Sequence, residues 1–290
     1  MRLSPIGPGS LIEARTLLAS VCAFDEAAIV AEEKLFGDSP DGPATVIGAH
    51  DKDGLLGLAV VCRGWLRLLA VETGGHDVGD RLLDEARAVA RQSGADRLRA
   101  AAQPGNYLTP GIDQRDEATI RFLLRHGYRQ VGESENLRVP LADNALVTTE
   151  RAAAMARAVS GYQLRRAVAD DAAGLLPWVE RDFGAAWAFE TGRALAGGTV
   201  HVGLAGDEIV AFAAHDGNNR GLGWFGPAAT QEAHRGRGLG AALLLPCLLD
   251  VRTAGRTSAV IAWSGPREFY LNAVGATSDR RFVILEEELA

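Results

Sequence analysis

The chain has 290 residues, enough for two domains of ordinary size, and its 47% hydrophobic and 23% charged residues are typical of globular proteins. Its formal net charge of −7 argues against electrostatic recognition of a nucleic acid or an anionic membrane surface. The three cysteines show neither a disulfide framework nor a metal-ligand spacing, and we find no signal segment and no bilayer-spanning apolar run, so we expect a cytoplasmic protein without a bound metal.

The first half of the chain predicts one strand, two helices, three strands, and then alternating helices and strands. Ser10 is expected to cap the first helix, with Glu13 at the capping-box position. The residues between the second and third strands have the composition of a hairpin turn. Strands are expected at residues 2–6, 45–49, 55–62, 65–71 and 97–102, helices at 10–23, 25–36, 80–93 and 117–126, and a closing hairpin at 128–141.

The second half repeats this order after a linker at residues 142–160, which includes an alanine-rich helix at 149–159. Strands are expected at residues 162–166, 200–205, 209–215, 222–225, 258–263 and 280–289, and helices at 170–181, 188–196, from about 238 to 249, and around residue 269. We therefore predict two tandem copies of one α/β fold, at residues 1–141 and 161–290, each a mixed, mostly antiparallel sheet flanked by helices. Only one strand fits after Gly275, so the second sheet either borrows a strand from the first copy or runs one short.

The most distinctive stretch joins an apolar strand to a helix through Arg235-Gly236-Arg237-Gly238-Leu239-Gly240. Its alternating glycines allow a tight turn and let the backbone come close to a ligand. The start of the following helix leaves N–H groups without internal partners and carries the positive end of the helix dipole. With two arginines beside it, this junction predicts an anion-binding loop. A plain strand-to-helix turn with surface arginines is the alternative.

The same glycines also fit the dinucleotide-binding pattern, as Gly236-x-Gly238-x-x-Ala241. That pattern requires repeated strand–helix–strand units and an acidic residue about 20 positions further on. The first acidic residue after the loop is Asp250, which is too early, and only one strand, a short helix and a final strand follow. We therefore favour an anion-binding loop of another kind.

The pattern Arg-x-x-Gly-x-Gly, after an apolar strand and at the start of a helix, resembles the pyrophosphate-binding loop of the GNAT acetyltransferases. A second landmark of that family follows in the pair Phe269-Tyr270 and the Gly275 turn, although Ala276 stands where the family usually has an aromatic residue. The resemblance covers about residues 161–290. It implies a GNAT-type fold and transfer of an acetyl group from acetyl-CoA to an amine.

The resemblance also assigns roles to individual residues. Backbone N–H groups of Ala229 and Thr230 would meet the thioester oxygen as negative charge develops on it, and Ser264 stands where many relatives have a cofactor-binding asparagine. Tyr270 would act as the general acid and protonate the leaving thiolate; its plain alternative is an aromatic residue that packs a helix on the sheet. The loop that would hold the pyrophosphate comprises Arg235, Gly236, Arg237, Gly238, Leu239, Gly240 and Ala241.

The acceptor is expected to be a small primary amine, bound near the first two helices of the second copy. Trp187 in this region offers a flat apolar surface that suits a sugar ring or a hydrophobic amine. The general base stays open among Glu190, His215, Asp216 and Glu232, and for each of them an ordinary surface role is the favoured alternative.

A closer resemblance rests on short segments. The loop Pro104–Asp113 and the string Trp263–Pro266 resemble those of tandem GNAT proteins similar to bacterial glucosamine/glucosaminide N-acetyltransferases, which favours an amino sugar as the acceptor. On this resemblance, Tyr107 and Asp113 of the first copy would reach a cleft shared with the second copy.

The two copies are not equivalent at the loop. Aligning them places Gly79 on Gly238 and His76 on Arg235, and brings two aspartates into the turn. Carboxylates beside a pyrophosphate repel it, so we expect one cofactor site per chain, in the second copy. The other functions considered are an acyl-CoA sensor or regulatory module without turnover, a mycothiol-synthase-like enzyme and an antibiotic acetyltransferase; both a monomer and a homodimer remain open.

Overall fold

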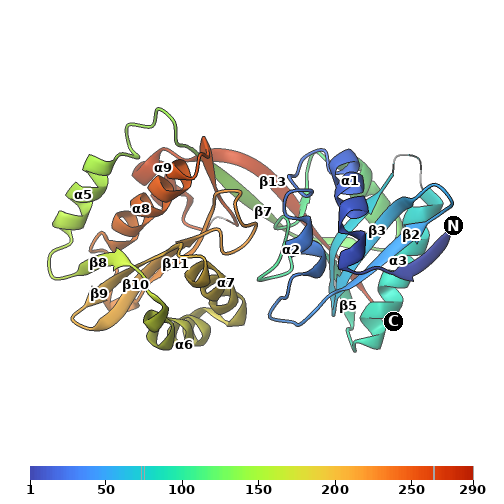
Figure 1. Ribbon diagram of the computed structural model, residues 1–290, viewed down its shortest axis with the longest axis horizontal. Helices are drawn as coiled ribbons and strands as arrows, with labels where there is room; N and C mark the ends of the chain where they lie inside the picture. Colours follow the sequence, from blue (N-terminus) through green and yellow to red (C-terminus); the bar gives the residue numbers. More distant parts are fainter. Residues whose placement is uncertain (73, 75, 264, 290) are drawn as a thin grey trace. The chain divides into compact units, whose positions relative to one another are not determined.

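The computed structural model describes residues 1–72, 74, 76–263 and 265–289, so Ser264 lies outside the described residues. The chain forms two compact units, Met1–Ser134 together with Arg281–Ala290, and Glu135–Arg280 (Figure 1). Each unit is a mostly antiparallel sheet flanked by helices, which confirms the expected α/β class. In the part of the chain that the structure describes, no helix has both the length and the apolar character needed to cross a bilayer.

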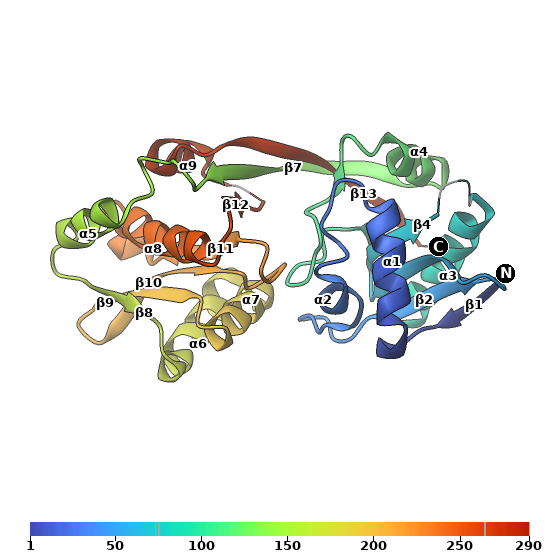
Figure 2. The same ribbon diagram turned by 45° about the horizontal axis from the view of Figure 1, so that its top comes forward.

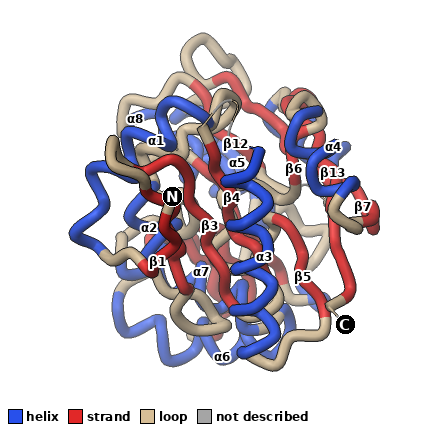
Figure 3. Tube along the Cα trace, turned by 90° about the vertical axis from the view of Figure 1, so that its right-hand side faces the viewer, coloured by secondary structure: helices blue, strands red, loops and turns tan. Residues whose placement is uncertain are grey.

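The sheet of the first unit has the strand order β1-β2-β3-β4-β5-β13, with β6 paired to β13. The helix α3 crosses one face of this sheet and α1 packs on the other, as Figures 2 and 3 show. Its elements are β1 (Arg2–Pro5), α1 (Leu11–Val21), α2 (Ala31–Phe36), β2 (Thr45–His50), β3 (Leu55–Cys62), β4 (Trp65–Val71), α3 (His76–Gln92), β5 (Arg97–Ala100), β6 (Ile112–Asp113), α4 (Glu117–Arg125) and the end of β13 (Thr277–Glu288).

The sheet of the second unit has the order β7-β12-β11-β10-β9-β8. The helix α8 packs on one face of the central strands, and α6 and α7 pack on the other (Figure 2). The elements are the end of β7 (Arg129–Pro140), α5 (Thr149–Ala158), β8 (Gln163–Arg166), α6 (Ala172–Phe183), α7 (Ala185–Ala196), β9 (Val200–Ala205), β10 (Glu208–His215), β11 (Trp224–Thr230), α8 (Leu239–Thr253), β12 (Ser258–Ile261) and α9 (Arg267–Val274).

Each half of the chain completes the sheet of the other unit with its last strand. The end of β7 pairs with β12 through residues such as Leu137, opposite Ile261. The end of β13 pairs with β5 in the same way, with Leu285 opposite Ala100. Of the two alternatives left open by the sequence, the second sheet therefore borrows a strand, and the exchange is reciprocal. It also moves the unit boundary away from the linker at residues 142–160, and it places the last residues of the chain in the first unit.

Buried ion pairs anchor the exchanged end of β13 in the first unit. The carboxylate of Glu287 lies 2.9 Å from an Arg87 Nη2 nitrogen, and that of Glu286 lies 2.6 Å from Arg99 Nη2. Both glutamates are buried. A shift of the strand would separate each buried carboxylate from its arginine and leave a buried charge without a partner, which is energetically costly. The two ion pairs therefore hold the strand in one register.

Three local predictions are wrong. The side chain of Ser10 makes no capping hydrogen bond at the start of α1. Residues 27–29 form a turn between two bends, so that the second helix is limited to Ala31–Phe36. The expected hairpin at 128–141 is the single strand β7, in which Gly132 lies in extended backbone near Ile284 rather than in a turn.

Candidate active site

A gap between two parallel strands organises the second unit. The strand β11 pairs with β12 only at its start, where Trp224 lies opposite Val260 and Phe225 opposite Ile261. Beyond these pairs, no described residue pairs with the edge of β11 that faces β12 along residues 226–230. The register against β10 shifts at this point, because β11 carries one more residue than its partner. Such a bulge bends the strand and turns its backbone groups toward the opening.

The open edge presents backbone donors. Gln231 N donates to Val210 O at 2.8 Å, and hydrogen-bonded pairs alternate along an antiparallel ladder. The register therefore directs the N–H of Ala229 toward β10, and those of Ala228 and Thr230 toward the gap. Of the two donors named from the sequence, Thr230 lies on the gap edge and Ala229 does not. The second donor on the gap edge is the N–H of Ala228, which was not predicted from the sequence.

The glycine-rich loop closes one end of this gap. Gly236 and Gly238 have φ values of +74° and +85°, a region that L side chains rarely adopt. Gly238 is the N-cap of α8, and no side chain caps this helix. Leu239 is buried beneath the loop and fixes the start of the helix, while Gly240 is exposed in the first turn. The backbone N–H groups of this turn are therefore presented to a ligand.

Both arginines of the loop are held by neighbouring groups. Arg235 donates from Nε to the Thr230 carbonyl at 3.2 Å. Arg237 donates from Nη1 to the Tyr162 hydroxyl at 2.9 Å, and that hydroxyl is also 2.8 Å from His234 Nδ1. Sequence reasoning missed Tyr162, because no motif connects a residue before β8 to a loop after β11. Its contact with Arg237 identifies it as a residue that orients the loop.

Tyr270 lies on α9 at the point where the gap opens. Its ring meets that of Phe225, the last paired residue of β11, edge-on at a centroid distance of 6.0 Å, and that of Phe269 at 5.0 Å. Burial raises the pKa of Tyr270 to about 12. Among the described residues, no group hydrogen-bonds to its hydroxyl. Tyr270 is therefore protonated at neutral pH and is able to act as a proton donor.

The predicted acceptor residues of the second unit differ in their surroundings. Trp187 is 36% exposed and stacks on Phe183 at a centroid distance of 4.9 Å, so it offers an aromatic platform. Glu190, one turn further along α7, is buried. The carboxylate of Asp216 accepts hydrogen bonds from Gly221 N and Gly223 N, which commits it to the turn before β11 and disfavours it as a base.

Asp216 also belongs to a buried histidine–carboxylate cluster. His215 Nδ1 lies 2.9 Å from Asp216, and its Nε2 lies 3.5 Å from Asp250, an ionic rather than hydrogen-bonded distance. Burial opposes the charged forms of His215 and Asp250, but the attraction between histidine and carboxylates prevails. The pKa of His215 is raised by Asp216 and Asp250. Hydrogen bonds from His201 and Arg166 help hold the pKa of Asp250 well below its usual range. The cluster is therefore ionised at mildly acidic pH.

This cluster predicts a pH window for stability. Because the pKa of His215 is higher in the folded than in the unfolded protein, the stabilisation is complete below the unfolded pKa of about 6.5 and is lost as the pH rises through the folded pKa. Because the pKa of Asp250 is lower in the folded protein, its stabilisation is present above the unfolded pKa of about 4 and is lost at lower pH. We expect His215→Gln to lower the free energy of unfolding by about 1–3 kcal/mol at pH 5–6 and by less at pH 9. Urea denaturation of both proteins across this range measures it, and a loss independent of pH would contradict the assignment.

Tyr107 and Asp113 lie in the first unit, and both are buried. Asp113 forms a bidentate ion pair with Arg115, with oxygen–nitrogen distances of 2.7 and 2.9 Å. Both residues belong to the loop that the sequence singled out. A cleft shared between the two copies stays a prediction.

Among the described residues of the first copy, the glycine-rich loop has no counterpart. Leu66 in the first copy corresponds to Phe225 in the second. Each is the last residue of its strand, β4 or β11, that pairs with the neighbouring parallel strand, β5 or β12. Counting along the chain from this register, Asp80 corresponds to Leu239, the first residue of α8. The helix α3, however, already begins at His76. The positions that form the loop in the second copy are therefore a helical turn in the first.

The tyrosine has no counterpart either. Leu137 of β7 lies opposite Ile261, the last residue of β12, and Leu285 of β13 lies opposite Ala100, the last residue of β5. Leu137 and Leu285 are therefore equivalent positions in the two sheets. Counting back from these residues without a gap places Phe122 at the position of Tyr270. The first copy thus lacks both the loop and the hydroxyl group.

Comparison with known proteins identifies the fold. No protein-family model and no curated protein matches this chain. Among solved structures, a GCN5-related glucosamine N-acetyltransferase region of a fungal multi-domain GH3 β-N-acetylglucosaminidase superposes with a TM-score of 0.78 at 18% identity, over 98% of this chain and 38% of that one. This chain therefore spans well under half of the fungal protein.

Two further structures match along nearly their whole lengths. A GCN5-related N-acetyltransferase from Sphaerobacter thermophilus has a TM-score of 0.71 at 18% identity, over 99% of this chain and 95% of that one. A tandem GNAT protein from the clavulanic acid biosynthesis pathway has a TM-score of 0.72 at 16% identity, over 100% and 98%. The chain has the tandem GNAT fold, which confirms the fold expected from the sequence resemblance.

Proposed function

We propose that this protein is an N-acetyltransferase that moves an acetyl group from acetyl-CoA to a small primary amine at the second copy. The observation that carries the proposal is the combination of an uncapped helix start, an open strand edge and a partly buried tyrosine around one gap. The first copy lacks the loop and the tyrosine, so one transfer site per chain is expected.

The loop fits the pyrophosphate of acetyl-CoA. A β-carbon at Gly236 would meet no atom within 4 Å, so the loop is open to a ligand on that side. The first N–H groups of α8 and the guanidinium groups of Arg235 and Arg237 are the donors that phosphate oxygens require. These residues would fix the cofactor and direct its thioester end along the gap.

Acetyl-CoA would supply an activated thioester. The N–H groups of Ala228 and Thr230 would face the carbonyl oxygen that gains negative charge during attack, an interaction worth about 10²–10³ in rate in other acyl-transfer enzymes. Tyr270, kept protonated by burial, would give its proton to the departing thiolate.

An amino sugar is the acceptor class that we favour. The fungal region that superposes on this chain is named as a glucosamine N-acetyltransferase, which supports the class without fixing the compound. The stacked Trp187–Phe183 pair adds a partly exposed apolar face of the kind that packs against sugar rings. Glucosides with a free amine are therefore the first acceptors to test.

Replacing Tyr270 by phenylalanine tests the proposal. We expect Tyr270→Phe to bind acetyl-CoA as the wild type does and to transfer about 100-fold more slowly, because only the proton donor is lost. Since the pKa of Tyr270 is raised to about 12, its hydroxyl keeps its proton below pH 10, and the wild-type rate should not fall in that range through deprotonation of Tyr270. Thiol release from acetyl-CoA with glucosamine, its glycosides, aminoglycosides and polyamines measures both.

The outcomes separate the proposed enzyme from a binding module. Turnover with one class of amine, slowed in Tyr270→Phe, supports the transferase. Tight binding of acetyl-CoA with no turnover on any amine would instead favour an acyl-CoA sensor, and an unchanged rate in Tyr270→Phe would remove Tyr270 from the chemistry.

A further inference from the structure

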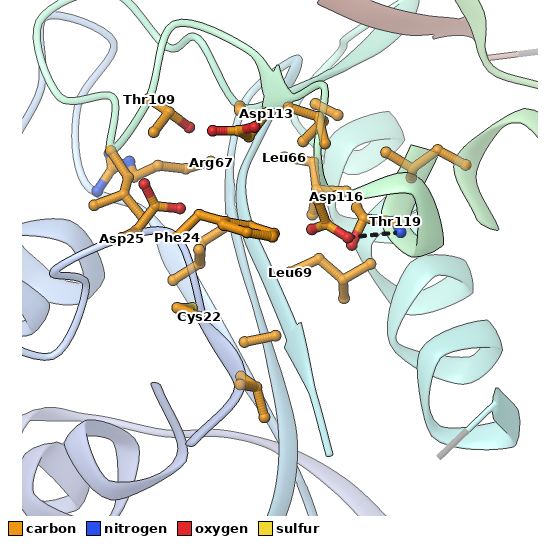
Figure 4. Close-up of a pocket in the computed structure, with 18 of the residues that line it drawn as sticks. Cys22, Phe24, Asp25, Leu66, Arg67, Leu69, Thr109, Asp113, Asp116 and Thr119 are labelled. Carbon is orange, nitrogen blue, oxygen red and sulfur yellow. Dashed lines mark hydrogen bonds between the residues drawn. The ribbon is translucent and has the colours of Figure 1, made fainter. Parts of the chain in front are cut away.

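The first unit contains a cavity of about 240 Å³ that the proposed transfer chemistry does not use (Figure 4). It lies against β4 where that strand parts from β5, beyond the pair formed by Leu66 and Ala100. The segment that follows α1 and the loop that leads into α4 form its other walls. This is the place that corresponds to the gap of the second unit, in the copy that lacks the phosphate loop.

The cavity combines an apolar floor with an acidic rim. Leu66 and Leu69 of β4, together with Leu123 of α4, supply the floor. Figure 4 shows the carboxylates of Asp25 and Asp116 on either side of the Phe24 ring in this view. A ligand with an apolar body and a polar group of positive charge matches this arrangement.

The two basic residues near the cavity, Arg67 and Arg115, are each bonded to other side chains or to the backbone. Arg67, which lines it, donates from Nε to Gln103 Oε1 at 2.6 Å and from Nη1 to the Lys34 carbonyl at 2.9 Å. Arg115 is held in its ion pair with Asp113. The acidic side chains of the lining outnumber its one arginine, so the electrostatic balance of the cavity is negative.

Asp116 is the best placed of these carboxylates to receive a cation. It uses Oδ1 to cap α4 by accepting a hydrogen bond from Thr119 N at 3.1 Å. A carboxylate has acceptor positions beyond one such bond. Burial raises the pKa of the neighbouring Cys22 thiol to about 12, with Asp25 and Asp116 adding to the effect, so the thiol stays neutral and the local field is negative.

The Phe24 ring already attracts one cation of the protein, which shows that the surroundings of this ring favour positive charge. The guanidinium carbon of Arg115 lies 4.6 Å from the centre of this ring. Aromatic faces attract ammonium groups in the same way. Phe24 is 39% exposed, so its ring is accessible from outside the unit.

We propose that this cavity binds a small primary amine with an apolar body, as a ligand site in the first copy where no acetyl transfer takes place. The ammonium group lies at Asp116 and Asp25, and the apolar part rests on the leucines of β4 and α4. The proposal does not depend on the function assigned to the second copy.

Calorimetric titration of the full chain, without acetyl-CoA, tests this site. The probes are 2-phenylethylamine, 2-phenylethanol and 3-phenylpropionate, which share a ring and differ in charge. We expect the amine to bind at least about 10-fold more tightly than the alcohol or the acid, because hydrogen bonds to a charged partner are the stronger ones.

Asp116→Asn is the decisive variant, because asparagine caps helices as well as aspartate does and only the charge is removed. It should weaken binding of the amine about 10-fold or more. Asp53→Asn, at an exposed turn of the same unit, should leave binding unchanged. Equal binding by Asp116→Asn and the wild type, loss of binding in Trp187→Ala instead, or displacement of the amine by coenzyme A would each overturn the proposal.

Discussion

Replacing Gly238 by aspartate is expected to abolish binding of coenzyme A. A β-carbon at this position would lie 3.4 Å from Val159 Cγ1, an ordinary contact, and the strain of a side chain at φ +85° is smallest for aspartate and asparagine. A carboxylate at the helix start would face the pyrophosphate, and two like charges about 4 Å apart cost about 4 kcal/mol near a protein surface. That corresponds to a loss of affinity of about 1000-fold, measured by calorimetric titration of coenzyme A.

Gly238→Asn is the matched control for this change. Asparagine has nearly the same shape as aspartate and, like it, tolerates the left-handed backbone conformation that Gly238 adopts, with φ +85°. It should weaken binding by less than about 10-fold, because it adds no negative charge. If both variants bind coenzyme A equally well, the anion does not lie at this helix start.

The strand exchange predicts which fragments of the chain fold. A fragment of residues 161–290, cut at the boundary expected from the sequence, lacks the strand that covers β12 and carries the end of β13 without its partner. It loses the buried Leu137 and Val139 and exposes Phe282 and Leu285, each worth about 1.5–3 kcal/mol when buried. Because domain stabilities are only about 5–15 kcal/mol, we expect this fragment to aggregate.

A fragment of residues 135–280 is the comparison, since it keeps every strand of the second unit. It should be recovered in solution and unfold cooperatively in a thermal denaturation followed by circular dichroism. The reverse result, a well-folded 161–290 and an aggregated 135–280, would show that the exchanged strands are dispensable. The two fragments differ only at their ends, so their composition does not explain the difference.

Local patterns were sufficient to predict most of the fold. Alternating apolar residues and turn composition located the strands of the two hairpins, β2–β3 and β9–β10, to within about two residues. The repeated order of elements predicted two copies of one fold. The expected hairpin at 128–141 was wrong because the segment is one strand, β7, and its only glycine, Gly132, is compatible with extended backbone as well as with a turn.

The reciprocal exchange could not be derived, because strand pairing between distant segments leaves no local signal. Leu137 and Leu285 have the same alternating pattern whichever sheet they complete. Which N–H groups of β11 face the gap depends in the same way on its register and bulge against β10. For that reason Ala228 was missed.

The glycine-rich loop was predicted from the sequence because its residue types are dictated locally, whereas Tyr270 was named only from the family resemblance. A helix start next to a ligand needs glycine where φ is positive, and this requirement is visible in the chain itself. Tyr162 and His234, which steady Arg237, were not found, because a tyrosine and a histidine have many roles and only their contact shows this one.

The most direct test of the account is a calorimetric titration of acetyl-CoA into the full chain. We expect one site per chain, unaffected by Tyr270→Phe, because among the described residues only the second copy has a glycine-rich loop at the start of its helix, α8. Two equivalent sites per chain, or no binding at all, would contradict it.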